Sequence, residues 1–215
     1  MNHSEPIIMG VLNVTPDSFS DGGKFFDSDL AIDQAKSMVE NGAGIIDIGG
    51  ESTRPGASAV SLNNELERVI PVIEALTKEI NVPISIDTSK PEVMEQAISS
   101  GANIINDVNA LRAEGALEMA AKLKVDVCLM HMQGNPRTMQ SNPSYADVVG
   151  DIKSFFKERI NACEQAGIEL SSITLDPGFG FGKNLGHNIA LLKNLSEFHE
   201  FGVSILAGLS RKSMI

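Results

Sequence analysis

The chain has 215 residues and a formal charge of −11 at pH 7, and 42% of its residues are hydrophobic. This length supports one sizeable core, so we expect a single domain over residues 1–215. The acidic balance, with no run of Lys or Arg, argues against a nucleic-acid surface, and no apolar run approaches the roughly 18 residues of a membrane span.

The two cysteines, Cys128 and Cys163, provide neither a disulfide framework nor the spacing of a metal site. We expect both to be buried thiols of a reduced protein. No signal peptide is recognisable at the start of the chain. These features predict a soluble, cytoplasmic protein.

Short apolar runs alternate with amphipathic ones along the chain. The apolar runs predict seven strands, at residues 7–14, 45–49, 83–87, 104–108, 126–130, 172–175 and 203–208. The intervals between them show a helical period near 3.6, most clearly over residues 66–80 and 148–163. The alternation predicts right-handed βαβ units and a wholly parallel sheet.

Helix boundaries are also marked. Residues 89–92 (SKPE) predict a capping box with proline in the first turn, and Gly42, Gly101 and Gly167 stand where helices should end. Pro71 lies inside one helical pattern and should kink or restart that helix.

A parallel sheet of this kind is either doubly wound or closed into a (β/α)₈ barrel. A barrel needs eight strands and about 250 residues, whereas this chain ends shortly after its seventh predicted strand. Its last residues, 210–215, look like the next loop and helix start. We therefore expect an α/β fold of the TIM (β/α)₈ barrel type, truncated after the seventh strand, with the last βα unit missing.

Polar residues stand at the carboxyl end of one predicted strand after another. In chain order they are Asn13, Asp47 with residues 51–54, Asp87, Asn106 with Asp107, His131, Asp176, and residues 210–212. A single such residue is often a helix cap, but a whole series of successive strands ending this way predicts a pocket floor. We expect His131, on an apolar strand, to be structural.

A glycine-rich stretch, residues 176–183 (DPGFGFGK), follows the sixth predicted strand. It is not a phosphate-binding P-loop, because Pro177 replaces the first glycine and Asn184 follows the lysine. Its glycines do not match the dinucleotide fingerprint either. The two phenylalanines instead suggest a backbone that approaches a flat ring closely.

Seven segments together resemble the dihydropteroate synthases. They occur in that family's order, at residues 9–23, 49–56, 86–92, 104–107, 129–134, 176–183 and 208–214. The resemblance implies a (β/α)₈ barrel that condenses 4-aminobenzoate with 6-hydroxymethyl-7,8-dihydropterin diphosphate. The products are dihydropteroate and diphosphate, in folate biosynthesis, and sulfonamides compete for the aminobenzoate site.

The resemblance also implies a pterin site. Asp176 would hold the 2-amino-4-oxo edge of the pterin, and Asp87 and Asn106 would meet other ring nitrogens. Lys212 would reach the acceptor side of the ring. Three further residues would contact the ring faces, namely Met130, Phe181 and Gly180.

For the remaining groups, the resemblance implies Mg²⁺ near Asn13, assisting loss of the diphosphate. Arg54 and Ser52 would bind the anion. The aminobenzoate would be bound by Thr53 and Ser213 between walls formed by Phe19 and Pro55. The residues expected to be catalytic are Lys212, Arg54 and Asp87. A homodimer is implied for the full-length form.

Two alternatives remain open at the level of sequence. One is a pterin-binding methyltransferase domain, which would lack the loop carrying Phe19 and the Ser-Arg-Lys segment at residues 210–212. The other is a barrel fragment without catalytic activity. The family's Arg-Val-His motif, at the end of the eighth strand, is absent from this chain. We therefore expect weak pterin binding and poor turnover from these 215 residues.

Overall fold

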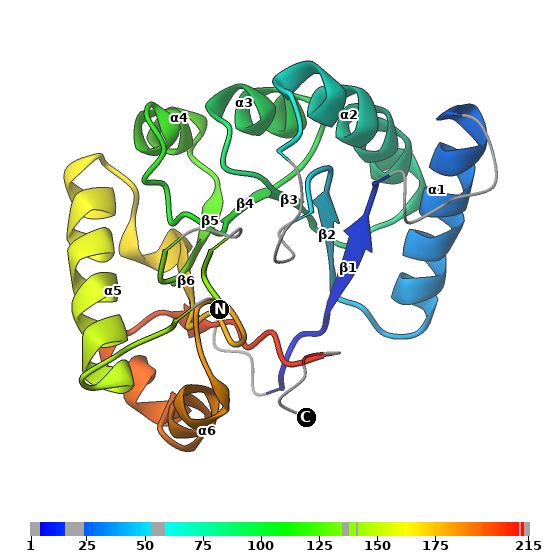
Figure 1. Ribbon diagram of the computed structural model, residues 1–215. Helices are drawn as coiled ribbons and strands as arrows, with labels where there is room; N and C mark the ends of the chain where they lie inside the picture. The colour runs from blue at the N-terminus through cyan, green and yellow to red at the C-terminus, as the bar shows by residue number, and fades with distance from the viewer. Residues whose placement is uncertain are drawn as a thin grey trace. The chain divides into compact units, whose positions relative to one another are not determined.

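The computed structural model describes residues 5–15, 24–52, 59–134, 138–140, 142–210 and 212. Strands and helices alternate over this part of the chain (Figure 1). In order they are β1 (Met9–Asn13), α1 (Lys24–Glu40), β2 (Ile45–Gly49), α2 (Leu62–Glu79), β3 (Ile84–Asp87), α3 (Pro91–Ser99), β4 (Ile104–Asp107), α4 (Ala116–Leu123), β5 (Asp126–Met130), α5 (Val148–Gln165), η2 (Leu170–Ser172), β6 (Ile173–Asp176), α6 (Leu185–Lys193), η3 (Leu195–Phe201) and β7 (Ser204–Ile205). Each predicted strand is present within three residues of its expected bounds.

The chain divides into two compact units. The first comprises Met1–Ser52 and Ala59–Asn106, and the second comprises Thr53–Ser58 and Asp107–Ile215. A single domain over the whole chain stays a prediction. Among the described helices, none is both long and apolar enough to cross a membrane.

In the first unit, β1 to β4 are parallel neighbours in chain order. Helices α1, α2 and α3 lie side by side along these strands (Figure 1). Because the strands are covered by helices, their isoleucines form the core: Ile46, Ile48, Ile86 and Ile105 have no exposed surface.

The register of these four strands aligns their last residues. Asn13 pairs with Gly49, Gly49 with Asp87, and Asp87 with Asn106. Neighbours at the same level of a parallel sheet project to the same face. The sheet therefore presents a row of polar side chains at its carboxyl edge, as the sequence predicted.

Helix α2 runs through Pro71 without restarting, so of the two predicted outcomes, a kink or a restart, the restart does not occur. Its buried stripe explains this, because Val69, Val72, Ile73 and Leu76 have no exposed surface. Burying four such side chains contributes several kcal/mol, on the order of 1.5–3 each, which outweighs the roughly 3 kcal/mol cost of an interior proline. Ser61 caps the helix by accepting a hydrogen bond from the Asn64 N–H at 3.3 Å.

The capping box predicted over residues 89–92 is wrong. Helix α3 has Lys90 as its N-cap, without a side-chain cap bond, although Pro91 does occupy the first turn as expected. The Lys90 side chain is engaged by two carboxylates instead. The predicted helix ends are confirmed at Gly42, Gly101 and Gly167, where φ is +100°, +112° and +91°.

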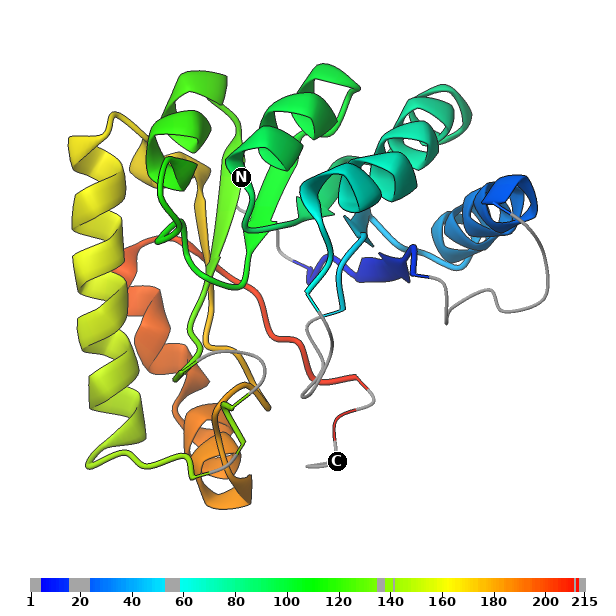
Figure 2. The same ribbon diagram turned by 45° about the horizontal axis from the view of Figure 1, so that its top comes forward.

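In the second unit, β5, β6 and β7 are parallel neighbours. Helix α6 and the 3₁₀ helix η3 lie along α5 (Figure 2). Phe156 of α5, Phe198 of η3 and Phe179 are completely buried in the core of this unit. Both cysteines are free and buried, as predicted.

Candidate functional site

The carboxyl edge of the first unit brings two side-chain oxygens together above Gly49. A Cβ atom placed on Gly49 would lie 3.5 Å from Asp87 Oδ2 and 3.7 Å from Asn13 Oδ1. Both oxygens therefore lie within van der Waals reach of the same point at the end of β2. Asn13 is exposed and Asp87 is partly exposed, so a ligand can reach both.

Asn106, in the same row, is held by a buried carboxylate. Its Nδ2 donates to Asp47 Oδ2 at 3.1 Å, and only 4% of Asp47 is exposed. This bond fixes the amide so that the nitrogen faces Asp47, which leaves the Asn106 oxygen as the acceptor on the other side. The sequence predicted polar groups at both positions but not this contact.

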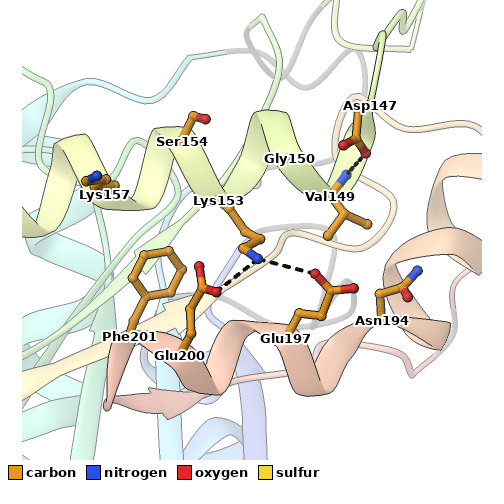
Figure 3. A pocket seen from close by; sticks show the side chains of 10 residues that line it. All are labelled: Asp147, Val149, Gly150, Lys153, Ser154, Lys157, Asn194, Glu197, Glu200 and Phe201. Atoms are coloured by element: carbon orange, nitrogen blue, oxygen red, sulfur yellow. Dashed lines mark hydrogen bonds and ion pairs between the residues drawn. The ribbon is translucent and has the colours of Figure 1, made fainter.

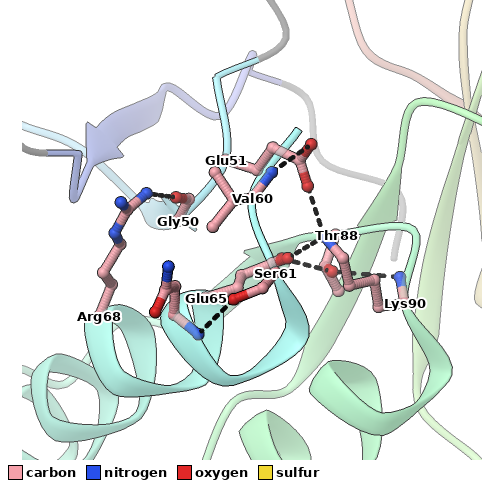
Figure 4. Close-up of polar contacts among 9 residues, drawn as sticks. Gly50, Glu51, Val60, Ser61, Glu65, Arg68, Thr88 and Lys90 are labelled. Atoms are coloured by element: carbon pink, nitrogen blue, oxygen red, sulfur yellow. Dashed lines mark hydrogen bonds and ion pairs between the residues drawn. The ribbon is translucent and has the colours of Figure 1, made fainter. Parts of the chain in front are cut away.

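A network of charged residues fastens the loops that follow β2 and β3 to helix α2 (Figure 4). The Lys90 ammonium donates to Glu51 Oε2 and to Glu65 Oε2, and the Thr88 hydroxyl donates to Glu65 Oε1 at 2.6 Å. Glu65 has no exposed surface. Burial lowers the pKa of Lys90, but the bonds to Glu51 and Glu65 outweigh it and the net pKa is raised.

The loop that follows β2 is held by hydrogen bonds both before and after residues 53–58. Glu51 Oε1 accepts from the Val60 N–H at 3.3 Å, and Arg68 donates to the Gly50 carbonyl at 2.7 Å. The sequence did not predict this network, because charged side chains near the start of a helix usually face solvent. Ser52, a predicted anion ligand, is partly buried beside it.

In the second unit, Asp176 ends β6 opposite Met130 of β5. Asp176 is 7% exposed, and its Oδ1 accepts from the Gly178 N–H at 2.7 Å. Burial raises the pKa of the Asp176 carboxyl. The hydrogen bond from the Gly178 N–H and the positive charges of Lys212 and Lys183 lower it, but burial outweighs them. Met130 packs in a buried cluster with Phe181 against it, and their predicted contact with the ring faces stays a prediction.

The glycine-rich loop after Asp176 packs closely on the loop after β5. Gly178, Gly180 and Gly182 all have positive φ. A Cβ on Gly178 would lie 2.0 Å from the His131 carbonyl oxygen, and one on Gly182 would lie 2.7 Å from that of Gln133. Only glycine fits at these two positions, because the neighbouring backbone leaves no space for a side chain. The expected approach of this loop to a flat ring stays a prediction.

Lys212 lies over this loop. Its Nζ is 4.7 Å from the centre of the Phe181 ring and donates to the Phe179 carbonyl, and its stem passes Gly180. Burial lowers the pKa of Lys212, against the attraction of Asp176. The geometry places a cation, an aromatic face and a buried carboxylate within one loop cluster.

Two polar residues at strand ends are structural. Asp107 accepts from the Asn109 and Leu111 N–H groups, both at 2.8 Å, and so holds a turn in which Ala110 and Leu111 have positive φ. His131 is buried, and burial, with the charges of Lys183 and Arg112, lowers its pKa to about 3. A neutral, buried imidazole agrees with the structural role predicted for His131.

Five predicted site residues lie outside the described residues: Phe19, Thr53, Arg54, Pro55 and Ser213. Within the described ranges, no group of three or more His, Cys, Asp or Glu side chains could hold a metal ion. Asn13 as a ligand of Mg²⁺ stays a prediction.

A surface pocket between α5 and η3 does not resemble a reaction site (Figure 3). Lys153 at its centre is paired with Glu197 at 3.2 Å and with Glu200 at 3.0 Å, and both carboxylates are about half exposed. Exposed pairs of this kind are weak, and their charges compensate one another.

The chain is similar to known proteins over nearly its whole length. Residues 9–215 match the profile of the family described as pterin binding enzyme. The dihydropteroate synthase of Escherichia coli (strain K12) is 57% identical over 212 residues, which cover 99% of this chain and 75% of that protein.

Two solved structures are similar over nearly the whole chain. The Yersinia pestis dihydropteroate synthase with a sulfonamide drug has a TM-score of 0.93 at 54% identity, covering 99% of this chain and 77% of that one. The Xanthomonas albilineans dihydropteroate synthase in complex with 7,8-dihydropteroate has a TM-score of 0.88 at 47% identity, covering 98% and 75%. The predicted fold class, an α/β fold of the TIM-barrel type that ends here after its seventh strand, is confirmed. The chain belongs to the pterin-binding enzyme family, and within that family to the dihydropteroate synthases, which are transferases.

Proposed function

We propose that this chain condenses 4-aminobenzoate with 6-hydroxymethyl-7,8-dihydropterin diphosphate to give 7,8-dihydropteroate and diphosphate. The observation that carries the proposal is the loop cluster in which buried Asp176 lies beside Lys212 and the Phe181 face. Its relatives are similar in sequence throughout, and one of them was solved with the product, 7,8-dihydropteroate.

Asp176 would recognise the pterin by its donor edge. A carboxylate accepts two parallel N–H bonds from a 2-amino-4-oxo ring, and the Gly178 N–H fixes one of its oxygens in place. Met130 and Phe181 supply apolar and aromatic surface for the ring, and Lys212 donates to its acceptor side. Gly180 leaves room for the Lys212 stem to pass.

Asp87 and Asn106 would contact further ring nitrogens. Asp87 is an acceptor, and the Asn106 oxygen is turned away from Asp47 by the bond at 3.1 Å. Such a preoriented amide binds a ring nitrogen without the entropy cost of ordering a free side chain.

Mg²⁺ is part of the proposal, and Asn13 fits it. Asn13 offers an exposed, neutral oxygen at the end of β1, and Mg²⁺ binds through few protein ligands, with phosphate oxygens and water completing its shell. When bound, the ion would neutralise the diphosphate as it departs. Asp87 Oδ2, over the same glycine, adds an acceptor for its hydration shell.

The chain's own residues would orient the two reactants and exclude water. Loss of diphosphate leaves a cation that the electron-rich pterin delocalises, and the neutral amine of aminobenzoate attacks the methylene carbon without a strong base. We assign diphosphate binding to Arg54 and Ser52. Aminobenzoate would be bound by Thr53 and Ser213, with Phe19 and Pro55 as walls.

A cytoplasmic location and a homodimer of a longer form complete the proposal. Two free, buried cysteines fit a reducing compartment.

The proposal is tested by calorimetric titration of 4-aminobenzoate with and without diphosphate and Mg²⁺. A synthase should bind aminobenzoate only when both are present, because the anion and ion complete the aminobenzoate site. A pterin-binding methyltransferase would bind pterin without this dependence. Binding of aminobenzoate that is equal under all conditions would contradict the proposal.

A further inference from the structure

Lys183 is a lysine buried in the second unit, with 3% of its surface exposed. Its Nζ lies 2.9 Å from the Gly178 carbonyl oxygen and 3.0 Å from that of Phe181. It also lies 3.2 Å from the His131 carbonyl oxygen and 3.1 Å from His131 Nδ1. One amine therefore joins the loop after β5 to the loop after β6.

These acceptors belong to irregular backbone that needs partners. The Gly178 carbonyl also accepts from the Phe181 N–H at 3.1 Å, which closes a turn over residues 178–181. Buried carbonyls without strand or helix partners are costly unless a donor reaches them. Lys183 supplies that donor from inside the loop.

Lys183 binds the carbonyls of the first and last residues of this turn, and the turn carries the groups proposed to bind pterin. At one end, the Gly178 N–H holds Asp176 Oδ1. At the other end, the Phe181 ring lies beneath Lys212. Displacing either carbonyl from Lys183 would move one of these groups.

The outer side of the loop has ties that do not involve Lys183. The Gly180 N–H donates to Asn188 Oδ1 at 2.9 Å, and the Tyr145 hydroxyl donates to the Gly182 carbonyl at 2.9 Å. The loop should therefore keep its general course when Lys183 is replaced, while the inner face loses its anchor.

We propose that Lys183 is a positioning residue for the pterin site, acting through the carbonyls of Gly178 and Phe181 rather than by contact with the ligand. The identity of the ligand in this inference rests on the proposed function, whereas the contacts of Lys183 do not depend on it. Its contact with His131 gives an independent spectroscopic signature.

That signature is the tautomer of His131. Burial lowers the pKa of Lys183 to about 7, against the attraction of Asp176, so the amine is predominantly an ammonium below neutral pH. An ammonium is a donor only, so in that state His131 Nδ1 accepts and the ring proton is on Nε2. The ring is otherwise packed edge-on against Phe155, at 4.9 Å between centroids. A long-range ¹H–¹⁵N spectrum of the parent protein at about pH 5, between the pKa values of Lys183 and His131, should show the Nε2–H form.

The variant test uses K183M, which keeps an unbranched side chain of nearly the same length and removes the amine. Its dissociation constant for 6-hydroxymethyl-7,8-dihydropterin diphosphate should rise about ten- to a hundredfold, as expected for the loss of a charge-assisted hydrogen bond. The KM for this substrate should rise more than kcat falls. The matched control is K193M, an exposed lysine at the end of α6, which should bind as the parent does.

Three outcomes overturn the inference: the Nδ1–H tautomer in the parent, unchanged His131 resonances in K183M, or parent-like pterin affinity in K183M. If circular dichroism shows K183M unfolded, K183Q replaces it, with the same expectation. A parent protein that binds no pterin refutes the proposed function instead, and the His131 spectra of parent and variant then still decide whether Lys183 ties the two loops.

Discussion

Asn106 donates its side-chain amide to the buried carboxylate of Asp47 at 3.1 Å, so the amide of a residue at the carboxyl edge of the sheet is oriented by a neighbouring buried carboxylate. Removing the acceptor in D47A should leave the amide free to rotate and weaken pterin binding about tenfold. D47N keeps an acceptor oxygen and should retain most of the affinity. Calorimetric titration of both variants checks this, and equal affinities for the two would contradict it.

D176N replaces an acceptor by an amide whose N–H₂ would face the donors of the pterin edge. We expect a loss of about 2–4 kcal/mol in pterin binding, because buried donors would be left unpaired. D151N, an exposed carboxylate in α5, is the control and should bind as the parent does. Parent-like binding by D176N would show that another group holds the pterin edge.

K90M should destabilise the first unit, because Glu65 would remain buried without its cation. The expected loss is about 2–3 kcal/mol in urea unfolding at pH 7, since a quarter of the Lys90 side chain is exposed. K36M removes an exposed pair with Glu79 and should leave the free energy of unfolding close to that of the parent. The double variant K90M/E65Q should recover part of the loss.

The pH dependence of the Lys90 effect has a defined sign. The pKa of Lys90 is raised in the folded state, so the folded chain holds this proton more firmly than the unfolded chain. The stabilisation is present below the ordinary lysine pKa of 10.5 and is lost as pH rises through the higher folded value. The difference between parent and K90M should therefore shrink in alkali, and a difference that grows would refute the assignment.

His131 should make the protein sensitive to acid. Its pKa falls to about 3 on folding, so between pH 6.5 and 3 the unfolded chain binds a proton that the folded chain does not. Stability present above pH 6.5 should be lost as pH falls, by about 2 kcal/mol at pH 5. H131Q should flatten this dependence of stability on pH. H199Q, at an exposed position of η3, is the control and should keep the dependence of the parent.

P71A should stabilise the protein, because an interior proline removes a helix hydrogen bond at an exposed position of α2. The expected gain is about 1–3 kcal/mol, measured as an increase in the urea midpoint. K78A in the last turn of the same helix should change stability by less than about 0.5 kcal/mol. A lower urea midpoint for P71A would mean that the Pro71 ring makes stabilising contacts.

The sequence was most informative where local pattern and burial agree. Strands such as Ile45–Gly49 are apolar because helices cover them, so their positions follow from composition alone, and parallel connection then aligns Asn13, Asp87 and Asn106 at one edge. This alignment follows from the two-residue alternation of side chains along each strand and does not need a particular side-chain contact.

The sequence was least informative where a charge is buried by residues far along the chain. Lys183 and Glu65 each look like a solvated charge near a helix start, and only His131 in the first case and Thr88 with Lys90 in the second reveal otherwise. Such partners come from loops whose packing is set by the whole fold, so no local pattern indicates them.

Gly178 combines a φ of +70° with a virtual Cβ only 2.0 Å from the His131 carbonyl. No other amino acid can be accommodated there without moving the strand end that carries Asp176. Substitution at Gly178 is therefore closed as a route to altered ligand binding, and such changes must come from the side chains around it. The Asp176 oxygen that accepts from the Gly178 N–H thereby keeps a fixed position, which makes this carboxylate a durable anchor for ligand design.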